Sequence, residues 1–111
     1  MIMEYVGPGG DVIIPHGVTD IFFEVFYGSA IITSVEIPGS ILDITPFIFE
    51  GCRKLKVIKI CEGASIINVT AFSNCLSLKK IYYNGSKDDW DLIVKEDNWD
   101  QHTSDHNIVF V

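Results

Sequence analysis

The sequence contains no long apolar run, few basic residues outside one central stretch, and three cysteines among its 111 residues. None of its apolar stretches reaches the roughly 18–20 residues of a membrane-spanning helix, so we predict no membrane span. The N-terminal stretch Met1–Tyr5 lacks the basic start and the apolar block of about 7–15 residues that mark a signal peptide. With 48% apolar and 21% charged residues the composition is that of a globular chain. We expect one domain spanning residues 1–111.

Patterns typical of catalytic, cofactor and metal sites are also missing. There is no Gly-x-Ser-x-Gly, and no serine or cysteine has a characteristic spacing to a histidine. The glycine cluster Gly7–Gly10 precedes an expected strand and not a helix, so it does not form a phosphate-binding loop. His102 and His106 stand four residues apart, but their segment is polar, and zinc sites usually bring three or four clear ligands. We expect no enzyme activity, no cofactor and no metal.

What the sequence does contain is an internal repeat with a period of 23 residues. Phe26, Phe49 and Phe72 mark it, because each stands 23 positions after the one before. The same offset aligns further apolar columns: Val12, Val35, Ile58 and Ile81; Ile14, Ile37, Ile60 and Tyr83; Ile21, Ile44 and Ile67; Ile32, Leu55 and Leu78. A period of this length indicates one supersecondary unit stacked on copies of itself. Because one unit cannot bury its own apolar face, about three are needed for stability.

Within each copy, short extended segments are predicted. Val35–Ile37 and Val57–Ile60 alternate apolar and polar residues, as half-buried strands do. Residues 18–21 and 41–44 fit a second short strand or an extended turn. The segment that ends near Cys52 fits a single helical turn or another extended piece.

These residues carry a family resemblance. The second copy resembles the BspA-like class of bacterial leucine-rich repeats. The resemblance lies in Ile-Pro at Ile37, apolar residues at Ile41 and Ile44, an aromatic at Phe49 and Cys-x-x-Leu-x-x-Ile from Cys52. The motif returns from Cys75 to Ile81, and the segments from Tyr5 to Pro15 and from Tyr83 to Trp90 are similar to the first and last segments of that class. Ser29 in place of cysteine, and Cys61-Glu62 in place of Pro-Gly, depart from the pattern.

The resemblance implies a β-rich right-handed solenoid with a ladder of parallel strands. Its three copies are residues 12–34, 35–57 and 58–80, between an N-terminal cap at 1–11 and a C-terminal helix-plus-strand cap at 81–111. It also implies that Cys52 and Cys75 are small, buried ladder residues. The odd number of cysteines argues further against a disulfide framework, and Cys61 is an additional thiol.

The two caps are predicted from local signals. Ser86 followed by Asp89 fits a loose capping box, and Trp90, Ile93 and Val94 fall on one helical face, which predicts a helix over residues 87–94. Residues 95–107 then form a polar loop, and residues 107–111 form a strand that pairs with the last rung. At the other end, Met1–Val6 is expected to shield the first open edge.

Strand positions between the buried columns should line the open face of the sheet. The candidate partner-binding residues are Ile13, Glu36, Lys59, Tyr82, Ser34, Val57 and Lys80, with Asp11 at the first rung. Because neighbouring strands lie about 4.8 Å apart, Glu36 and Lys59 should be cross-strand neighbours of opposite charge. The alternative is a solvated ladder that only fixes the register.

Charge is distributed unevenly along the chain. The formal net charge is −7, and residues 84–111 hold seven acids against Lys87 and Lys95, which leaves −2 for the rest. The other six bases form a stripe: Arg53, Lys54, Lys56, Lys59, Lys79 and Lys80. This stripe is too short, and the chain too acidic, to indicate nucleic-acid binding. A solvated face is the simpler interpretation, although a dipolar surface can orient the module against a partner or a second copy.

Together these features predict a non-catalytic module that binds a protein or a glycan. The resemblance implies a bacterial surface or secreted protein in contact with a host, although no signal peptide is present in this chain. The alternative is an intracellular scaffold or a self-associating assembly protein, and for self-association the apolar pair Phe22 and Phe23 offers a candidate surface. Neither the ligand nor the location follows from the residues alone.

Overall fold

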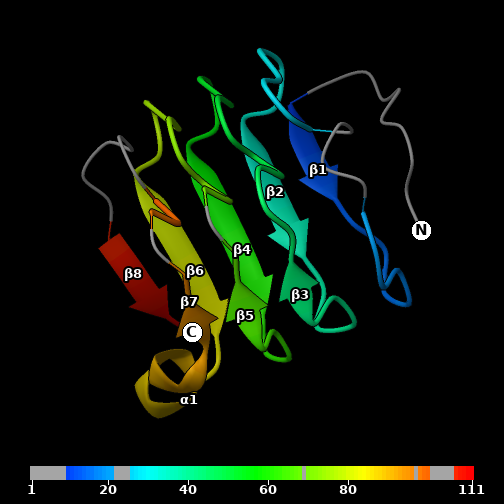
Figure 1. The fold of residues 1–111 in the computed structure, drawn as a ribbon, viewed down its shortest axis with the longest axis vertical. Coiled ribbons are helices and arrows are strands. Elements are labelled where there is room, and N and C mark those ends of the chain that lie inside the picture. Colours follow the sequence, from blue (N-terminus) through cyan, green and yellow to red (C-terminus); the bar gives the residue numbers. More distant parts are fainter. Residues whose placement is uncertain (1–9, 22–25, 69, 97, 101–106) are drawn as a thin grey trace.

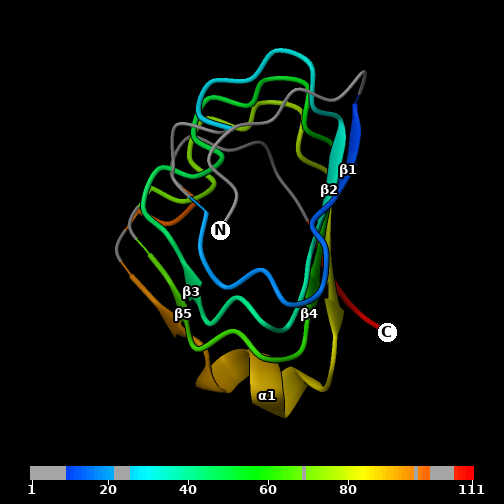
Figure 2. The same ribbon diagram turned by 90° about the vertical axis from the view of Figure 1, so that its right-hand side faces the viewer.

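The computed structural model describes residues 10–21, 26–68, 70–96, 98–100 and 107–111. The chain coils so that successive turns place their strands side by side in two parallel sheets. Figure 2 shows these sheets on opposite sides of the coil, with helix α1 below them. The five-stranded sheet has the order β1-β2-β4-β6-β8, with strands Asp11–Ile13, Ser34–Ile37, Val57–Cys61, Lys80–Asn84 and Asn107–Phe110 (Figure 1). The three-stranded sheet has the order β3-β5-β7, with strands Asp43–Ile44, Ile66–Ile67 and Val94–Lys95.

The 23-residue period of the sequence sets the register in which neighbouring strands pair. Val12 pairs with Val35, Val35 with Ile58, and Ile58 with Ile81 along the larger sheet. Ile44 pairs with Ile67 in the smaller one. The predicted solenoid with a parallel ladder is therefore confirmed, and it makes about four turns. Of the two segments for which a strand or an extended turn was predicted, residues 41–44 contain the strand β3.

The apolar columns fill the space between the sheets. Phe26, Phe49 and Phe72 are all at most 1% exposed and stack with ring centroids 5.5 and 5.8 Å apart. Trp99 continues this column with an edge-on contact of 5.9 Å to Phe72. Dispersion and burial act along the whole stack, so each aromatic ring stabilises the turns on both sides of it.

The segment that leads to Cys52 is neither a helix nor a strand. It is a series of tight turns, in which the N–H groups of Ile48, Glu50 and Cys52 donate to carbonyls three residues earlier. Phe47 and Gly51 have positive φ angles of 65° and 74° within these turns. This backbone reverses direction between the sheets without the i to i+4 hydrogen bonds of an α-helix.

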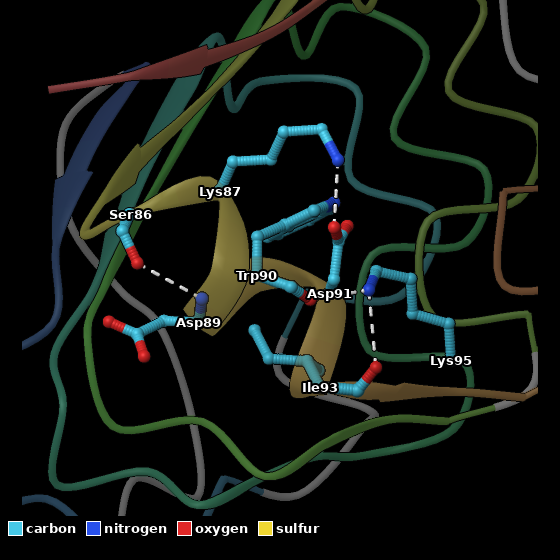
Figure 3. Close-up of polar contacts among 7 residues, drawn as sticks. All are labelled: Ser86, Lys87, Asp89, Trp90, Asp91, Ile93 and Lys95. Atoms are coloured by element: carbon cyan, nitrogen blue, oxygen red, sulfur yellow. Dashed lines mark hydrogen bonds and ion pairs between the residues drawn. The ribbon is translucent and has the colours of Figure 1, made fainter.

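Helix α1 spans Lys87–Leu92 and begins as predicted: Ser86 is the N-cap, and its hydroxyl accepts a hydrogen bond from the Asp89 N–H at 3.1 Å (Figure 3). Trp90 and Ile93 are buried. The prediction that the helix continues to Val94 is wrong, because Val94 lies in β7 and is 55% exposed. Its N–H donates to the Ser65 carbonyl at 3.0 Å. Val94 therefore pairs with the neighbouring turn of the coil and does not extend the helix.

Lys95 also belongs to β7, which corrects the prediction that the polar loop begins there. Its ammonium donates to the carbonyls of Trp90 and Ile93 at 2.7 and 3.1 Å and lies 4.5 Å from the Trp90 ring centroid (Figure 3). Partial burial lowers the pKa of this ammonium. Lys95 therefore satisfies two carbonyls at the C-terminal end of α1, where a cation is favoured.

The last strand confirms the predicted pairing at the end of the chain. In β8, Asn107 pairs with Lys80 and Ile108 with Ile81 of β6. The offset here is 27 residues, because α1 lengthens this turn of the coil. The segment predicted as a C-terminal cap thus holds most of β6, and it adds β7 to the smaller sheet and β8 to the larger one. The proposed N-terminal shield, Met1–Val6, lies outside the described residues.

Cys52 and Cys75 are free thiols, both 0% exposed, as the resemblance implied. Their sulfurs donate to the carbonyls of Phe26 and Phe49 at 3.1 and 3.3 Å. At the corresponding position of the first copy, the Ser29 hydroxyl accepts from the N–H groups of Ile31 and Ile32. Burial raises the pKa of Cys52 to about 11 and that of Cys75 to about 12.

These shifts predict a loss of stability at alkaline pH. Below pH 9.0, the ordinary pKa of a cysteine thiol, both thiols are protonated in the folded and in the unfolded chain, so their contribution to the free energy of unfolding is fully present. As the pH rises from 9 towards 11–12, only the unfolded chain ionises them, so the free energy of unfolding should fall by about 1.4 kcal/mol per pH unit for each thiol. Urea unfolding across this range measures the slope. The double variant Cys52→Ala/Cys75→Ala should be less stable at pH 7 but have a shallower slope; an unchanged slope would contradict the assignment.

Candidate binding face

The seven candidate residues lie on the outer surface of the five-stranded sheet. The register aligns one column, Ile13, Glu36, Lys59 and Tyr82, and beside it a second column, Asp11, Ser34, Val57 and Lys80. Residues between them, such as Val35 and Ile58, point inward and are buried. The structure therefore brings all seven, together with Asp11, onto one surface, here called the sheet face, while their role in binding stays a prediction.

The sequence analysis missed one member of the sheet face. Val109 pairs with Tyr82 and continues its column onto β8. The offset of 27 hides Val109 from a search at period 23. The run of four apolar, strand-favouring residues from Ile108 to Val111 was the available signal.

Opposite charges meet in the middle of the sheet face. Lys59 Nζ lies 3.7 Å from Glu36 Oε1, with both side chains partly exposed. This contact confirms the predicted cross-strand pair. A solvated pair of this kind contributes less than about 1 kcal/mol, so it orients two side chains and fixes the register without holding the sheet together.

A shallow depression lies over β1, β2 and β4 around this ion pair. Its outward-pointing lining residues are Asp11, Ile13, Ser34, Glu36, Val57 and Lys59. Asp11 Oδ1 accepts hydrogen bonds from the hydroxyls of Ser34 at 2.7 Å and Thr33 at 3.4 Å. Ile13 is 72% exposed, so the depression combines an unshielded aliphatic surface with fixed carboxylates at its edge.

The other half of the sheet face is basic and aromatic. Tyr82 is partly exposed, and Lys80 Nζ lies 5.9 Å from its ring centroid, within the range of a cation–π contact. The acids Asp11 and Glu36 occupy β1 and β2, while Lys59 and Lys80 occupy β4 and β6. The face thus changes sign along the coil axis, which favours one orientation of a ligand over the reverse.

A second depression is lined by Thr19, Asp20, Ser40, Leu42 and Asp43. Its Ser40 hydroxyl donates to the Val18 carbonyl and accepts from the Gly17 N–H, so this polar group joins two neighbouring turns. Among the described residues, no group of three His, Cys, Asp or Glu side chains is arranged to hold a metal. His102, His106, Phe22 and Phe23 lie outside these residues.

Within the described part of the chain, no helix has the length and apolarity needed to cross a membrane. A model of the "BspA type Leucine rich repeat region (6 copies)" family matches residues 10–91, which is most of the chain. No curated protein and no solved structure matches the chain significantly.

Proposed function

The chain belongs to the BspA type leucine-rich repeat family, and from that premise we propose that it is a non-catalytic module that captures a protein or glycan ligand on its sheet face. Repeat solenoids present extended surfaces on which many weak contacts add up, and this favours recognition over chemistry. The carboxylates of the sheet face are each held by a neighbour, Asp11 by Ser34 and Glu36 by Lys59. No hydroxyl–imidazole or thiol–imidazole pair occurs among Asp11 and the seven candidate residues.

The observation that carries this proposal is the exposed, chemically mixed surface over β1, β2, β4 and β6. Ile13 supplies aliphatic area, Tyr82 an aromatic ring, and Glu36 and Lys59 supply oriented charges. Aromatic residues with a polar tip are enriched at binding surfaces because they bury a large area with few rotatable bonds. The strands below are paired in register, so a ligand meets preorganised side chains.

The proposal is tested by affinity capture with the variant Glu36→Ala/Lys59→Ala/Tyr82→Ala. Wild type and variant are immobilised and exposed in parallel to host-cell matrix and to lysate of the source cell. Capture of an extracellular ligand by the wild type, with loss of most of it in the variant, is the expected result. The matched control is Leu42→Ala/Asp43→Ala on the opposite side of the coil, which should bind as the wild type does.

Equal capture by the sheet-face variant would contradict the proposal. Capture from the lysate alone, or of the protein's own chain alone, would support the intracellular scaffold instead. Sedimentation at increasing concentration separates these last two outcomes, since self-association depends on the protein's own concentration. An unchanged monomer rules out the self-associating form.

A further inference from the structure

A second surface with a different chemistry lies at the turns that precede the strands of the large sheet. Each turn is fixed by buried residues: the Leu55 N–H donates to the Cys52 carbonyl at 3.2 Å, and the Leu78 N–H donates to the Cys75 carbonyl at 3.2 Å, with all four side chains buried. The residues between these anchors therefore point outward. With their neighbours they form the turn-tip surface, defined as Ile31, Arg53, Lys54, Lys56, Leu76 and Lys79.

Four of the chain's eight basic residues gather on this surface, and all four are exposed. Lys79 N–H donates to the Lys56 carbonyl at 2.8 Å, so these two lysines occupy adjacent turns about 4.8 Å apart. The ion pairs found among the described residues, Lys59–Glu36 and Lys87–Asp91, use other lysines. Glu50, an acid in the turns that lead to Cys52, accepts a hydrogen bond from Asn74 at 3.4 Å. In the described part of the chain, none of these four cations takes part in an ion pair.

Large apolar side chains lie among these cations. Ile31 is 60% exposed and Leu76 is 57% exposed. Stacking at an offset of 23 puts Ile31 beside Lys54 and Leu76 beside Arg53 in the neighbouring turn. A purely ionic ligand gives no reason to expose these two side chains. A surface that combines cations with protruding aliphatic side chains suits a partner with an anionic outer layer and an apolar layer beneath it.

The rest of the molecule carries the opposite charge. Helix α1, with exposed Asp88 and Asp91, lies on the edge of the coil opposite these turns (Figures 1 and 2). A chain of net charge −7 with one basic edge has a strong dipole. Near an anionic surface, this dipole turns the turn-tip surface inward and α1 outward.

We propose that the turn-tip surface binds the headgroup region of an anionic lipid bilayer, with the four cations at the phosphates and Ile31 and Leu76 inserted beneath them. Each basic side chain near such a surface strengthens binding severalfold, and shallow aliphatic insertion adds to this. The site is separate from the sheet face, so one module can hold a membrane and a ligand together. This is peripheral contact and requires no membrane-spanning segment.

The test is cosedimentation of the protein with vesicles of phosphatidylcholine alone and of phosphatidylcholine mixed with phosphatidylserine. We expect binding to the anionic vesicles only. The electrostatic contribution to this binding should be lost in 1 M salt, where the screening length is about 3 Å. Lys56→Gln should weaken partitioning by about fivefold. The matched control Lys87→Gln removes the same charge from α1 and should leave partitioning nearly unchanged.

The aliphatic contribution has its own variant. Ile31→Ser/Leu76→Ser should weaken partitioning by at least about tenfold while leaving the salt dependence in place. Equal effects of Lys56→Gln and Lys87→Gln would overturn the proposal, as would equal binding to neutral vesicles. Retention on immobilised heparin or an acidic peptide, without binding to anionic vesicles, would also overturn it and assign the surface to a soluble polyanion. Circular dichroism of each variant checks that the fold is intact.

Discussion

Phe49→Ala is expected to destabilise the protein by about 3–5 kcal/mol. Phe49 has no exposed surface and is the middle ring of the stack, 5.5 Å from Phe26 and 5.8 Å from Phe72. Truncation removes the buried ring, breaks both aromatic contacts and leaves a cavity that the rungs on either side cannot fill, because their backbones are hydrogen-bonded in register. The loss is a large fraction of the 5–15 kcal/mol that is typical of a domain. Urea unfolding followed by circular dichroism measures it.

Phe47→Ala is the matched control for this substitution. Phe47 lies two residues earlier in the same series of turns but is 40% exposed. The same atoms are removed there with less burial and without a closed cavity, so we expect the loss to be smaller by at least about 2 kcal/mol. Similar losses of unfolding free energy at the two positions would show that the buried aromatic column contributes no more to the stability of the coil than an exposed ring does.

The repeat alone was sufficient to predict most of this arrangement. A ladder of parallel strands requires equivalent residues on neighbouring rungs to share an environment, so Val12, Val35, Ile58 and Ile81 had to be buried together. By the same logic, the sequence alone predicts that Glu36 lies beside Lys59, as it does in the structure. Where one short unit is repeated without insertions, residues separated by one period in the sequence are neighbours in space.

Prediction failed where helix α1 enters the repeat. The helix shifts later residues from an offset of 23 to 27 or 28, so Val94, Trp99 and Val109 match no earlier column although each continues one. Local periodicity assigned Val94 to the helix because it follows Trp90 and Ile93 at helical spacing. The hydrogen bond from its N–H to Ser65 decides otherwise, and a contact with a residue 29 positions away leaves no local signal.

The basic stripe was visible in the sequence, but its division between two surfaces was not. Lys59 stands at an outward strand position and pairs with Glu36, whereas Lys56 belongs to the turn that precedes the strand. The turn that begins at Cys52 projects its middle residues, Arg53 and Lys54, away from the core, and this depends on the burial of both its ends. Composition therefore revealed the charge, while the anchoring of each turn determined which surface carries it.

The second large effect is expected at a glycine contact between two rungs. Gly63 has a φ of +143°, which L-residues with side chains rarely adopt, and a Cβ there would lie 2.8 Å from Gly39 Cα and 2.9 Å from the Gly39 carbonyl carbon. Gly63→Ala therefore combines backbone strain with a clash against the Gly39 backbone of the neighbouring turn. We expect a loss of about 2–5 kcal/mol in the free energy of unfolding, again measured with urea.

Gly17→Ala separates the two causes of that loss. Gly17 also has a positive φ, +94°, but a Cβ there would meet no atom within 4 Å. Its replacement should therefore cost the strain alone, about 1–2 kcal/mol, and the excess at Gly63 measures the close approach of the rungs. Equal losses would mean that the rungs at this corner separate to admit a methyl group, so that the side chains of the core and not backbone contact set their spacing. A larger loss at Gly63 would mean that the corner between β4 and β5 accepts only glycine, because the neighbouring turn has already filled the space.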